Sequence, residues 1–425
     1  MKPAKKITIQ GNFFKPWLSL ILDPYHELCQ LTKRINWDSL ENEFEKFFVK
    51  DRGAPAKPVR LVVGIMMLQN MYGFSDEGAV EEWVENPYWQ FFCGEKQLQV
   101  DPPINPSSLP RWRKRIGKEG MSKILNATIK SAIVTGTVSK KNLKKAIVDT
   151  TVMEKNITFP TDAKTRYRAI CRLVKMSKTI GIKLHQTYVR IGRKQLISAG
   201  KYAHARQMKK AKKAREKIKI YLGRLYRTIQ KQIEGNKFLK SFFTKIFEIV
   251  EKLLKQARES KDKIYSIHEP DVDCISKGKD HKKYEFGCKA SFVITHKEGL
   301  ALSAQAFHKN PYDGHTLKDV LEDAEKRSNH KIDQVYVDKG YKGHKIQDKK
   351  IFISGKKRLT NWFKRQLKRR QAIEPHIGHM KSDGKLGRNY LRGKLGDHLN
   401  VILCGIGHNL RMIARYLRRV VPVPI

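Results

Sequence analysis

The sequence has few acidic residues for its length. Against 87 lysines and arginines stand only 41 aspartates and glutamates among 425 residues, which leaves a formal net charge of +46. An excess this large would repel itself unless a polyanion were usually bound, so the composition predicts nucleic acid as the partner. A membrane surface is the weaker alternative, because polybasic anchors usually come with lipidation or an amphipathic insertion helix. A solvated surface explains any one lysine-rich helix, but not an imbalance of two to one over the whole chain.

The chain also lacks the cysteine spacing of zinc fingers and of disulfide scaffolds. Its six cysteines lie far apart without a CxxC pair, which predicts buried thiols in a reducing compartment. The N-terminal segment MKPAKKITIQGNFFKP has no apolar core of signal-peptide length, and WLSLIL is too short to span a membrane. We therefore expect a cytoplasmic, nucleoid-associated protein without membrane contact.

The order of periodic segments predicts the domain organisation. A hydrophobic content of 40% indicates a folded protein. Residues 1–135 show helical periodicity, as in LVVGIMMLQNMYGF, a helix that should end near Gly73. Residues 165–263 are helical and very basic, and their outer face could carry DNA or simply be solvated. Residues 136–164 and 264–425 together read as a three-strand meander followed by alternating helices and strands.

This connectivity is that of a ribonuclease H-like domain. The predicted fold class is therefore α/β, with a ribonuclease H-like catalytic core interrupted by a helical insertion and preceded by an all-helical N-terminal domain. The Lys-Glu-Gly between KYEFGCKASFVIT and LALSAQAFH indicates a β-hairpin. DGHTLKDVLEDAEKR predicts a helix with Thr316 as its N-cap and four apolar residues facing inward: Leu317, Val320, Leu321 and Ala324.

A basic helix in the N-terminal region is a candidate DNA contact. Ser107 or Ser108 is expected to cap a short helix that has Pro110 near its start. That helix would expose basic side chains beside Trp112 and could rest on phosphates through Arg111, Arg113, Lys114 and Arg115. A solvated basic helix with Trp112 in the core explains the segment about equally well.

Three carboxylates are the candidate catalytic residues. Asp149 in KKAIVDTTV and Asp338 in DQVYVDKGYKG each close a short apolar run, and neighbouring central strands would bring them together; Glu374 would approach from a late helix. Cleaving or exchanging a phosphodiester needs an activated oxygen nucleophile and charge neutralisation, which two divalent ions about 4 Å apart provide. Mg²⁺ prefers oxygen ligands. We predict Mg²⁺, with Mn²⁺ as a substitute, bridged by Asp149 and bound further by Asp338 and Glu374.

Two cations flank the predicted glutamate in sequence. Arg370 and Lys381 would supply positive charge where phosphate oxygens lie, and on an uninterrupted helix they would share one face with Glu374. Pro375 complicates this arrangement. Either the helix kinks there, or a helix starts at about Glu374 with Pro375 in its first turn.

Other carboxylates compete for the same role. Asp271 and Asp273 form a D-x-D after a proline, Asp313 precedes Gly314 in a turn, and Asp162 lies in a loop near Asp149. A single aspartate at a strand end is usually a cap, and an arginine four residues before a glutamate is usually a surface ion pair. Spacing alone hardly favours Asp149, Asp338 and Glu374.

The chain resembles the DDE transposases of bacterial insertion sequences, in the group typified by insertion sequence five. The resemblance rests on DTTV from Asp149, IHEPDVDCISKGKDHKKYEFGCK (267–289), NPYDGHTL (310–317), VDKGYKGH around Asp338 and IEPHIGHMKSDGKLGRN (373–389). It extends to GNFFKPWLSLIL and NPSSLPRWRKRIG and so covers most of the chain. The family signature is Tyr, two residues, Arg, three, Glu, six, Lys. Arg370, Glu374 and Lys381 fit it, whereas Leu367 takes the tyrosine position, a departure that concerns a phenol contact to DNA and not the metal ligands.

The resemblance implies a function as well as a site. It implies Asp149, Asp338 and Glu374 as the catalytic triad and ranks them above Asp271 and Asp273. It implies cleavage of double-stranded DNA at the element's terminal inverted repeats, then attack of the freed 3′-hydroxyls on target DNA. The N-terminal helical region would recognise the element's ends within a homodimeric synaptic complex. Two alternatives stay open: a ribonuclease H-like nuclease without strand transfer, and a DNA-binding protein whose catalytic site has decayed.

Overall fold

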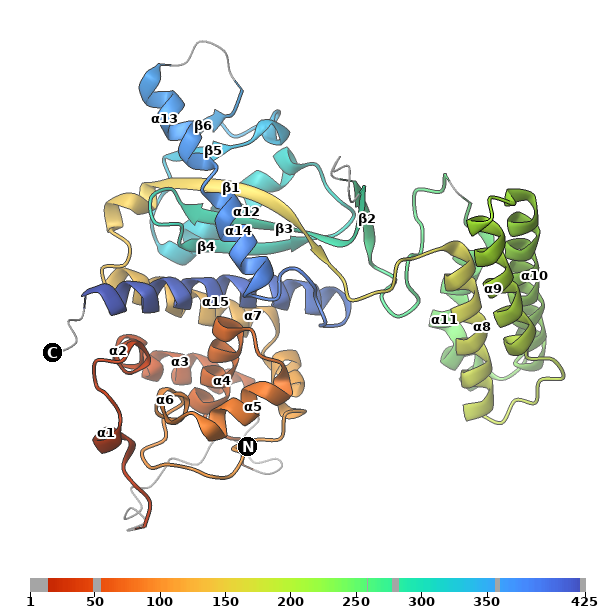
Figure 1. Cartoon of the computed structure of the whole chain (residues 1–425), viewed down its shortest axis with the longest axis horizontal. Helices are drawn as coiled ribbons and strands as arrows, with labels where there is room; N and C mark the ends of the chain where they lie inside the picture. Colours follow the sequence, from red (N-terminus) through yellow and green to blue (C-terminus); the bar gives the residue numbers. More distant parts are fainter. Residues whose placement is uncertain (1–13, 49–54, 258, 277–282, 356–359, 421–425) are drawn as a thin grey trace. The chain divides into compact units, whose positions relative to one another are not determined.

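The structure is a computed structural model that describes residues 14–48, 55–257, 259–276, 283–355 and 360–420 (Figure 1). Residues 1–13, in which the sequence predicts no signal segment, lie outside this description. The chain divides into two compact units: the first unit comprises Met1–Glu154 and Cys288–Ile425, and the second unit comprises Lys155–Gly287. The predicted division at residues 135, 164 and 263 stays a prediction.

Helices build the N-terminal part of the first unit, as the apolar periodicity predicts. Gly73 ends α4 at φ +79°, a left-handed conformation that glycine adopts without strain, so the predicted end of this helix is confirmed. Gly117, at φ +57° and ψ −159°, breaks α7 into two parts. The elements are α1 (Leu18–Ile21), α2 (Glu27–Arg34), α3 (Trp37–Phe44), the 3-10 helix η1 (Glu45–Phe47), α4 (Val59–Tyr72), α5 (Asp76–Glu85), α6 (Pro87–Phe92) and α7 (Ser108–Val134).

A mixed sheet forms the centre of the first unit. Its strand order is β4-β3-β1-β5-β6, with β3 and β4 antiparallel and with β5 parallel to both β1 and β6. The predicted hairpin and the run of three neighbouring strands followed by a helix and a parallel strand are confirmed. The elements are the 3-10 helix η2 (Lys140–Lys144), β1 (Lys145–Glu154), β3 (Tyr284–Thr295), β4 (Ala301–Phe307), α12 (Asp313–Ser328), β5 (Gln334–Val337), the 3-10 helix η3 (Lys339–Tyr341) and β6 (Lys350–Ile353).

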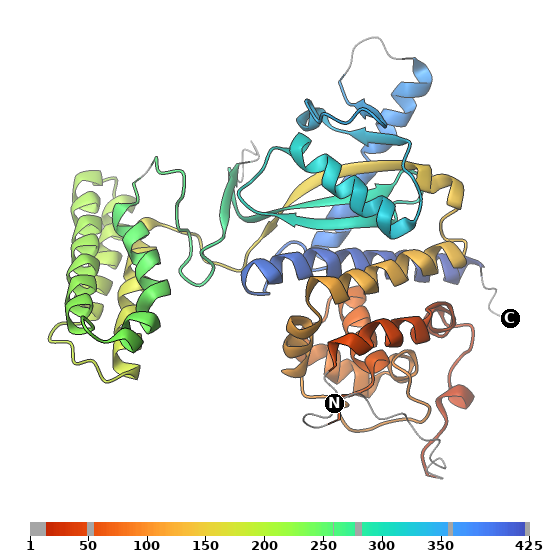
Figure 2. The same cartoon turned by 180° about the vertical axis from the view of Figure 1, so that it is seen from behind.

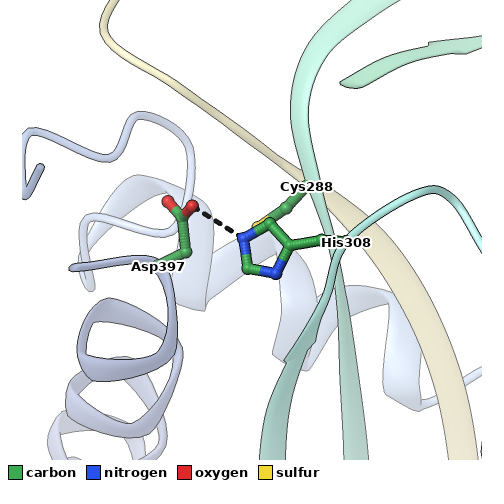
Figure 3. A group of neighbouring side chains, drawn as sticks. All are labelled: Cys288, His308 and Asp397. Carbon is green, nitrogen blue, oxygen red and sulfur yellow. Dashed lines mark hydrogen bonds and ion pairs between the residues drawn. The ribbon is translucent and has the colours of Figure 1, made fainter. Parts of the chain in front are cut away.

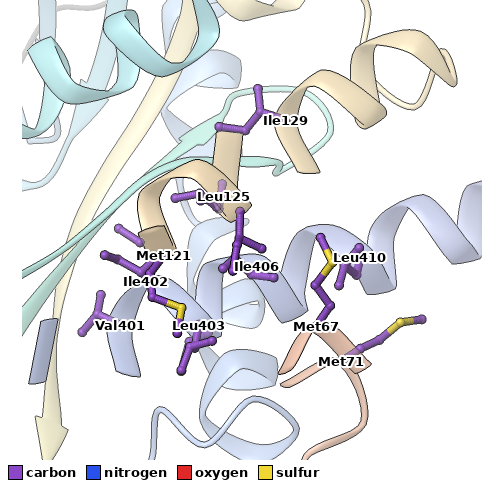
Figure 4. Packing of buried hydrophobic residues seen from close by; sticks show 14 of the residues in the cluster. Met67, Met71, Met121, Leu125, Ile129, Val401, Ile402, Leu403, Ile406 and Leu410 are labelled. Carbon is purple, nitrogen blue, oxygen red and sulfur yellow. The ribbon is translucent and has the colours of Figure 1, made fainter. Parts of the chain in front are cut away.

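Three further helices follow the sheet: α13 (Asn361–Arg370), α14 (Ile373–Ser382) and α15 (Gly393–Val420). α15 packs against β4, α7 and α4, and the two views of the chain show α7 and α15 side by side (Figures 1 and 2). The packed side chains are buried and apolar, so the N-terminal helices and the sheet share one hydrophobic core. Residues in this core include Met67, Met71, Met121, Leu125, Ile129, Val401, Ile402, Leu403, Ile406 and Leu410 (Figure 4).

The helix α12 differs from its prediction at its first turn. Leu317, Val320, Leu321 and Ala324 are fully buried, as predicted. Thr316 is not the N-cap, because the helix already begins at Asp313, and the Thr316 hydroxyl donates to the Asp313 carbonyl oxygen (2.9 Å). Asp313 is therefore the first residue of a helix and not part of a turn. Its carboxylate at the helix N-terminus is favoured by the helix dipole.

The second unit is a helical bundle with a short β-hairpin. The apolar stripe predicted on α10 is fully buried: Ile218, Leu222, Leu225 and Ile229. Lysines and arginines occupy most of the exposed positions of the same helix, so it is amphipathic with a cationic outer face. The elements are α8 (Asp162–Thr179), α9 (Val189–His204), α10 (Met208–Gln232), α11 (Lys237–Lys255) and β2 (Asp273–Ser276), which pairs with residues 284–287 of β3.

Candidate active site

Asp149 lies on β1, and Asp338 directly follows the neighbouring parallel strand β5. In the pairing of β1 with β5, Lys145 lies opposite Gln334 and Ile147 opposite Tyr336, partners whose numbers differ by 189 (334 against 145). The same difference separates 338 from 149, so extending this offset by two residues, one past the end of β5, would set Asp338 opposite Asp149. Neighbouring strands lie about 4.8 Å apart and opposed side chains share a face. Both aspartates are half-buried.

Asp338 is fixed by the backbone that follows β5. It is the N-cap of η3, and its Oδ1 accepts a hydrogen bond from the Gly340 N–H (2.8 Å). A Cβ atom placed on Gly340 would lie 3.1 Å from Asp338 Oδ1 and 3.3 Å from Asp313 Oδ2. Two carboxylates therefore lie close to this position, and any Cβ there would be crowded by both.

Asp313 is held by a buried lysine and a hydroxyl from β1. Lys289 Nζ donates to Asp313 Oδ1 (2.8 Å) and to the Pro311 carbonyl oxygen (2.7 Å). The hydroxyl of Thr150, the residue after Asp149, donates to the same Asp313 oxygen (3.0 Å). Asp313 thus joins the start of α12 to both β3 and β1. A carboxylate fixed in this way can position its neighbours, and its charge is balanced by Lys289.

Tyr341 is a buried residue whose hydroxyl is influenced by the charges of all three aspartates. Its side chain is fully buried. Burial raises the pKa of its hydroxyl well above the ordinary value, and the nearby negative charges of Asp149, Asp313 and Asp338 raise the pKa further. The tyrosine therefore stays neutral, and the charges of all three aspartates reach it.

Glu374 is exposed and lies beside Arg370. It lies in the first turn of α14, which packs against β1 through buried Ile373, Ile377 and Met380. The Glu374 side chain is 65% exposed, and its Oε1 lies 3.9 Å from the guanidinium of Arg370 at the end of α13. Of the two alternatives for this segment, a new helix with Pro375 in its first turn is the correct one, because α13 ends at Arg370 and α14 begins at Ile373.

The donor atoms of the site fit a hard divalent ion, although they are not gathered as tightly as a bound ion would require. Asp149 and Asp338 offer carboxylate oxygens, which Mg²⁺ prefers. Within the described residues, the donor atoms of Asp149, Asp338 and Glu374 do not all lie within 4.8 Å of one another. Of the three side chains only that of Glu374 is exposed.

The three N-terminal arginines differ in their surroundings. Arg111 is exposed and donates to the Ser107 carbonyl oxygen (3.1 Å), and exposed Arg115 lies over the Trp112 ring at 5.6 Å. Arg113 is buried, with its guanidinium donating to both carboxylate oxygens of Asp76 and to Gln69 Oε1 (3.3 Å). Its predicted exposure is wrong, and we leave Arg113 out of the candidate DNA contacts.

Comparison with known proteins identifies the family. Residues 18–115 match the family described as Transposase domain (DUF772), and residues 254–410 match the Transposase DDE domain. An uncharacterized protein from Rhizobium meliloti, ORF8 in the nfe locus, is 40% identical over 207 residues, which is 49% of this chain and 100% of that protein. No solved structure matches the chain. The chain belongs to the insertion-sequence DDE transposases.

Several residues of the transposase site were not singled out from the sequence. Lys289, Thr150, Gly340 and Tyr341 all contact or surround the aspartates, and Asp313 was weighed only as a competitor. Each lies inside one of the motifs that carried the resemblance, such as FGCK, DTTV and DKGYKG. Those motifs therefore meet in space.

Among the described helices of the transposase, none combines the length and apolar character of a membrane span.

Proposed function

We propose that this transposase, of the insertion sequence five group, cleaves double-stranded DNA at its element's terminal inverted repeats and transfers the freed 3′-hydroxyls to target DNA. The observation that carries the proposal is the shared offset of β1 and β5, which sets Asp338 opposite Asp149 when the pairing is continued. The strand order β4-β3-β1-β5-β6 supports a ribonuclease H-like assignment for the sheet.

In this proposal Asp149, Asp338 and Glu374 would hold Mg²⁺, for which Mn²⁺ could substitute. When bound, the divalent ions lower the pKa of the attacking water or 3′-hydroxyl and stabilise charge on the leaving oxygen. Asp313 is a positioning residue, since Lys289 and Thr150 hold it beside Asp338. Half-burial of Asp149 and Asp338 leaves them reachable by water and a phosphate while limiting the freedom of their side chains.

Arg370 and Lys381 are assigned to the DNA phosphates. Arg370 lies beside Glu374, and its side chain is only 14% exposed. A DNA phosphate would compete with the Glu374 carboxylate for this guanidinium, because Arg binds phosphate through two parallel hydrogen bonds. Glu374 would then be released from Arg370 and could turn towards Asp149.

The other parts of the chain would supply DNA binding and assembly. Exposed Arg111 and Arg115 on α7 support a contact of the N-terminal region, residues 1–135, with the element's ends. The cationic face of α10 would extend DNA binding to the insertion, residues 165–263. Two copies would bring two element ends together, in the nucleoid of a bacterial cytoplasm.

The decisive experiment compares two carboxylates at opposite ends of one strand. Asp338 follows β5, whereas Asp333 precedes it and is exposed. We expect Asp338→Asn, Asp149→Asn and Glu374→Gln to lose Mg²⁺-dependent cleavage of a plasmid that carries the gene with its native flanks. All three should still bind the end DNA, and Asp333→Asn should cleave like wild type.

The other results have definite meanings. Undiminished cleavage by Asp338→Asn would refute the site assignment. Cleavage without joined products by the wild type would favour the nuclease without strand transfer. Binding of the ends by soluble wild type without any cleavage would favour the catalytically decayed DNA-binding protein.

A further inference from the structure

A second group of potential metal ligands lies where β3, the end of β4 and α15 meet. Among the described residues, the donor atoms of Cys288, His308 and Asp397 all lie within 4.8 Å of one another. Figure 3 shows the three side chains pointing toward one another from these three elements. We infer that Cys288, His308 and Asp397 form a binding site for a divalent transition metal of the zinc class.

The sheet itself brings the first two ligands together. Lys289 pairs with Phe307 in the antiparallel register of β3 and β4, so the next pair outward is Cys288 with His308. Opposed residues of antiparallel strands share a face, with Cβ atoms about 4.5–5.5 Å apart. Lys289, one position further, points to the other face and reaches Asp313. The thiol site and the carboxylate site therefore lie on opposite faces of β3.

The third ligand is oriented by its own hydrogen bonds. Asp397 Oδ2 lies 3.0 Å from His308 Nε2, and Asp397 Oδ1 accepts from the Asn389 side-chain amide at 2.7 Å. Asn389 is fully buried, and its backbone N–H donates to the Glu154 carbonyl oxygen (2.7 Å). Protein metal sites commonly hold a ligand carboxylate through such an outer hydrogen bond, which fixes its direction.

The ligand set fits zinc-class ions by chemistry and by size. Zn²⁺ takes a cysteine sulfur at about 2.3 Å and histidine nitrogen or carboxylate oxygen at about 2.0–2.2 Å, in a tetrahedron. Donor atoms within 4.8 Å of one another need only a small approach to reach that geometry. His398 is the candidate fourth ligand: its ring lies 5.6 Å from that of His308, and its Nδ1 is buried without a hydrogen-bond partner.

Burial decides against a nucleophilic thiol. A Cys–His–Asp arrangement can also activate a cysteine for attack, but such a thiol must be reached by its substrate. Cys288 is only 2% exposed, and the Asp397 side chain is 8% exposed. An ion can enter through small fluctuations, whereas an ester or peptide cannot. The bound metal would clamp α15 to the β3–β4 hairpin.

The test is metal binding by the full-length, metal-free protein. We expect one equivalent of Zn²⁺ to bind per chain in competition with a chromophoric chelator. Co²⁺ in its place should give a thiolate-to-metal charge-transfer band. Cys288→Ser should abolish the band, and Asp397→Asn should weaken Zn²⁺ binding at least about tenfold. Cys404→Ser is the matched control, because Cys404 is a buried cysteine on α15 whose Sγ donates to the Gly384 carbonyl oxygen (2.7 Å).

Two further readouts keep the inference falsifiable. In the presence of saturating Mg²⁺, Zn²⁺ should raise the melting temperature of the wild type further, because a ligand that binds only the folded state stabilises it. Asp149→Asn should bind Zn²⁺ like wild type, which separates this site from the carboxylate site. Wild type without stoichiometric Zn²⁺ binding, or a Co²⁺ complex without the thiolate band, would overturn the inference even if Cys288→Ser fails to fold.

Discussion

The buried pair of Arg113 and Asp76 allows a prediction with a calculable size. The Arg113 side chain is 6% exposed and that of Asp76 22%, and both carboxylate oxygens accept from the guanidinium. Removing one partner of a buried pair costs about 3–5 kcal/mol, because the other charge stays buried. Lys385 is a second cation near Asp76 and replaces part of the missing attraction. We therefore expect Arg113→Ala to lower the free energy of unfolding by about 2–4 kcal/mol.

The pH dependence gives this prediction a sign. Burial raises the pKa of Asp76, but the hydrogen bond and charge of Arg113, helped by Gln69, outweigh it and leave the pKa below its ordinary value. A carboxyl whose pKa is lower in the folded state stabilises the fold above its unfolded pKa of about 3.9. That stabilisation is lost as the pH falls through the folded pKa. The deficit of Arg113→Ala should therefore be complete at pH 7 and shrink below about pH 4.

Arg115 provides the matched control on the same helix. It is exposed and lies over the Trp112 ring, an interaction of about 0.5–1 kcal/mol. In urea unfolding, Arg115→Ala should keep nearly the wild-type midpoint, while its affinity for end DNA should fall. Arg113→Ala should show the reverse. An Arg113→Ala protein with unchanged stability and weakened DNA binding would refute the structural role of Arg113.

Three further predictions concern the carboxylates and the basic helix. Gly340→Ala should reduce metal-dependent cleavage, because its Cβ would crowd both Asp338 and Asp313, whereas Gly378→Ala, with open space around the new Cβ, should cleave like wild type. Lys289→Met should lower the urea midpoint and the cleavage rate together, since it leaves Asp313 without its cation; an unchanged midpoint would contradict this. Four exposed lysines of α10 can be changed to glutamine: Lys209, Lys210, Lys212 and Lys213. This variant should bind DNA more weakly. The slope of log Kd against log salt should also fall by about 0.9 for each phosphate that the variant no longer neutralises. An unaltered slope would mean that this face is only solvated.

Local periodicity predicted the elements because burial of a strand or helix face repeats along the chain. The stripe Ile218, Leu222, Leu225 and Ile229 is fully buried for this reason. Arg113, which was predicted to be exposed, is buried by the same helical periodicity. It lies four residues after Leu109 and three before Ile116, which are both buried. A count of basic residues does not register position on a helix. Nor does it register a partner such as Asp76, which lies 37 residues away.

Contacts between elements were less accessible to sequence reasoning. Asp149 and Asp338 could be paired because each follows a short apolar run typical of a central strand, although β1 continues through Asp149 to Glu154. The position of Glu374 cannot be predicted in this way. The direction of its side chain depends on how α14 is rotated when it buries Ile373, Ile377 and Met380 in the core. The residue spacing within the signature is retained, yet it does not determine which way the side chain points.

The group formed by Cys288, His308 and Asp397 could not be found from the spacing of its residues in the sequence. A single extra residue in the hairpin changes which side chains lie opposite each other. Near the turn, β3 and β4 pair Ile294 with Ala301, and on that register Cys288 would lie opposite Phe307. A β-bulge between Val293 and Ile294 shifts the pairing by one, so that Lys289 lies opposite Phe307 and His308 takes the place opposite Cys288. Asp397 then arrives from a helix 89 residues further along the chain. A search for zinc spacing therefore finds nothing, although the bulge places a thiol and an imidazole on one face of the hairpin, next to a carboxylate that packing has already oriented.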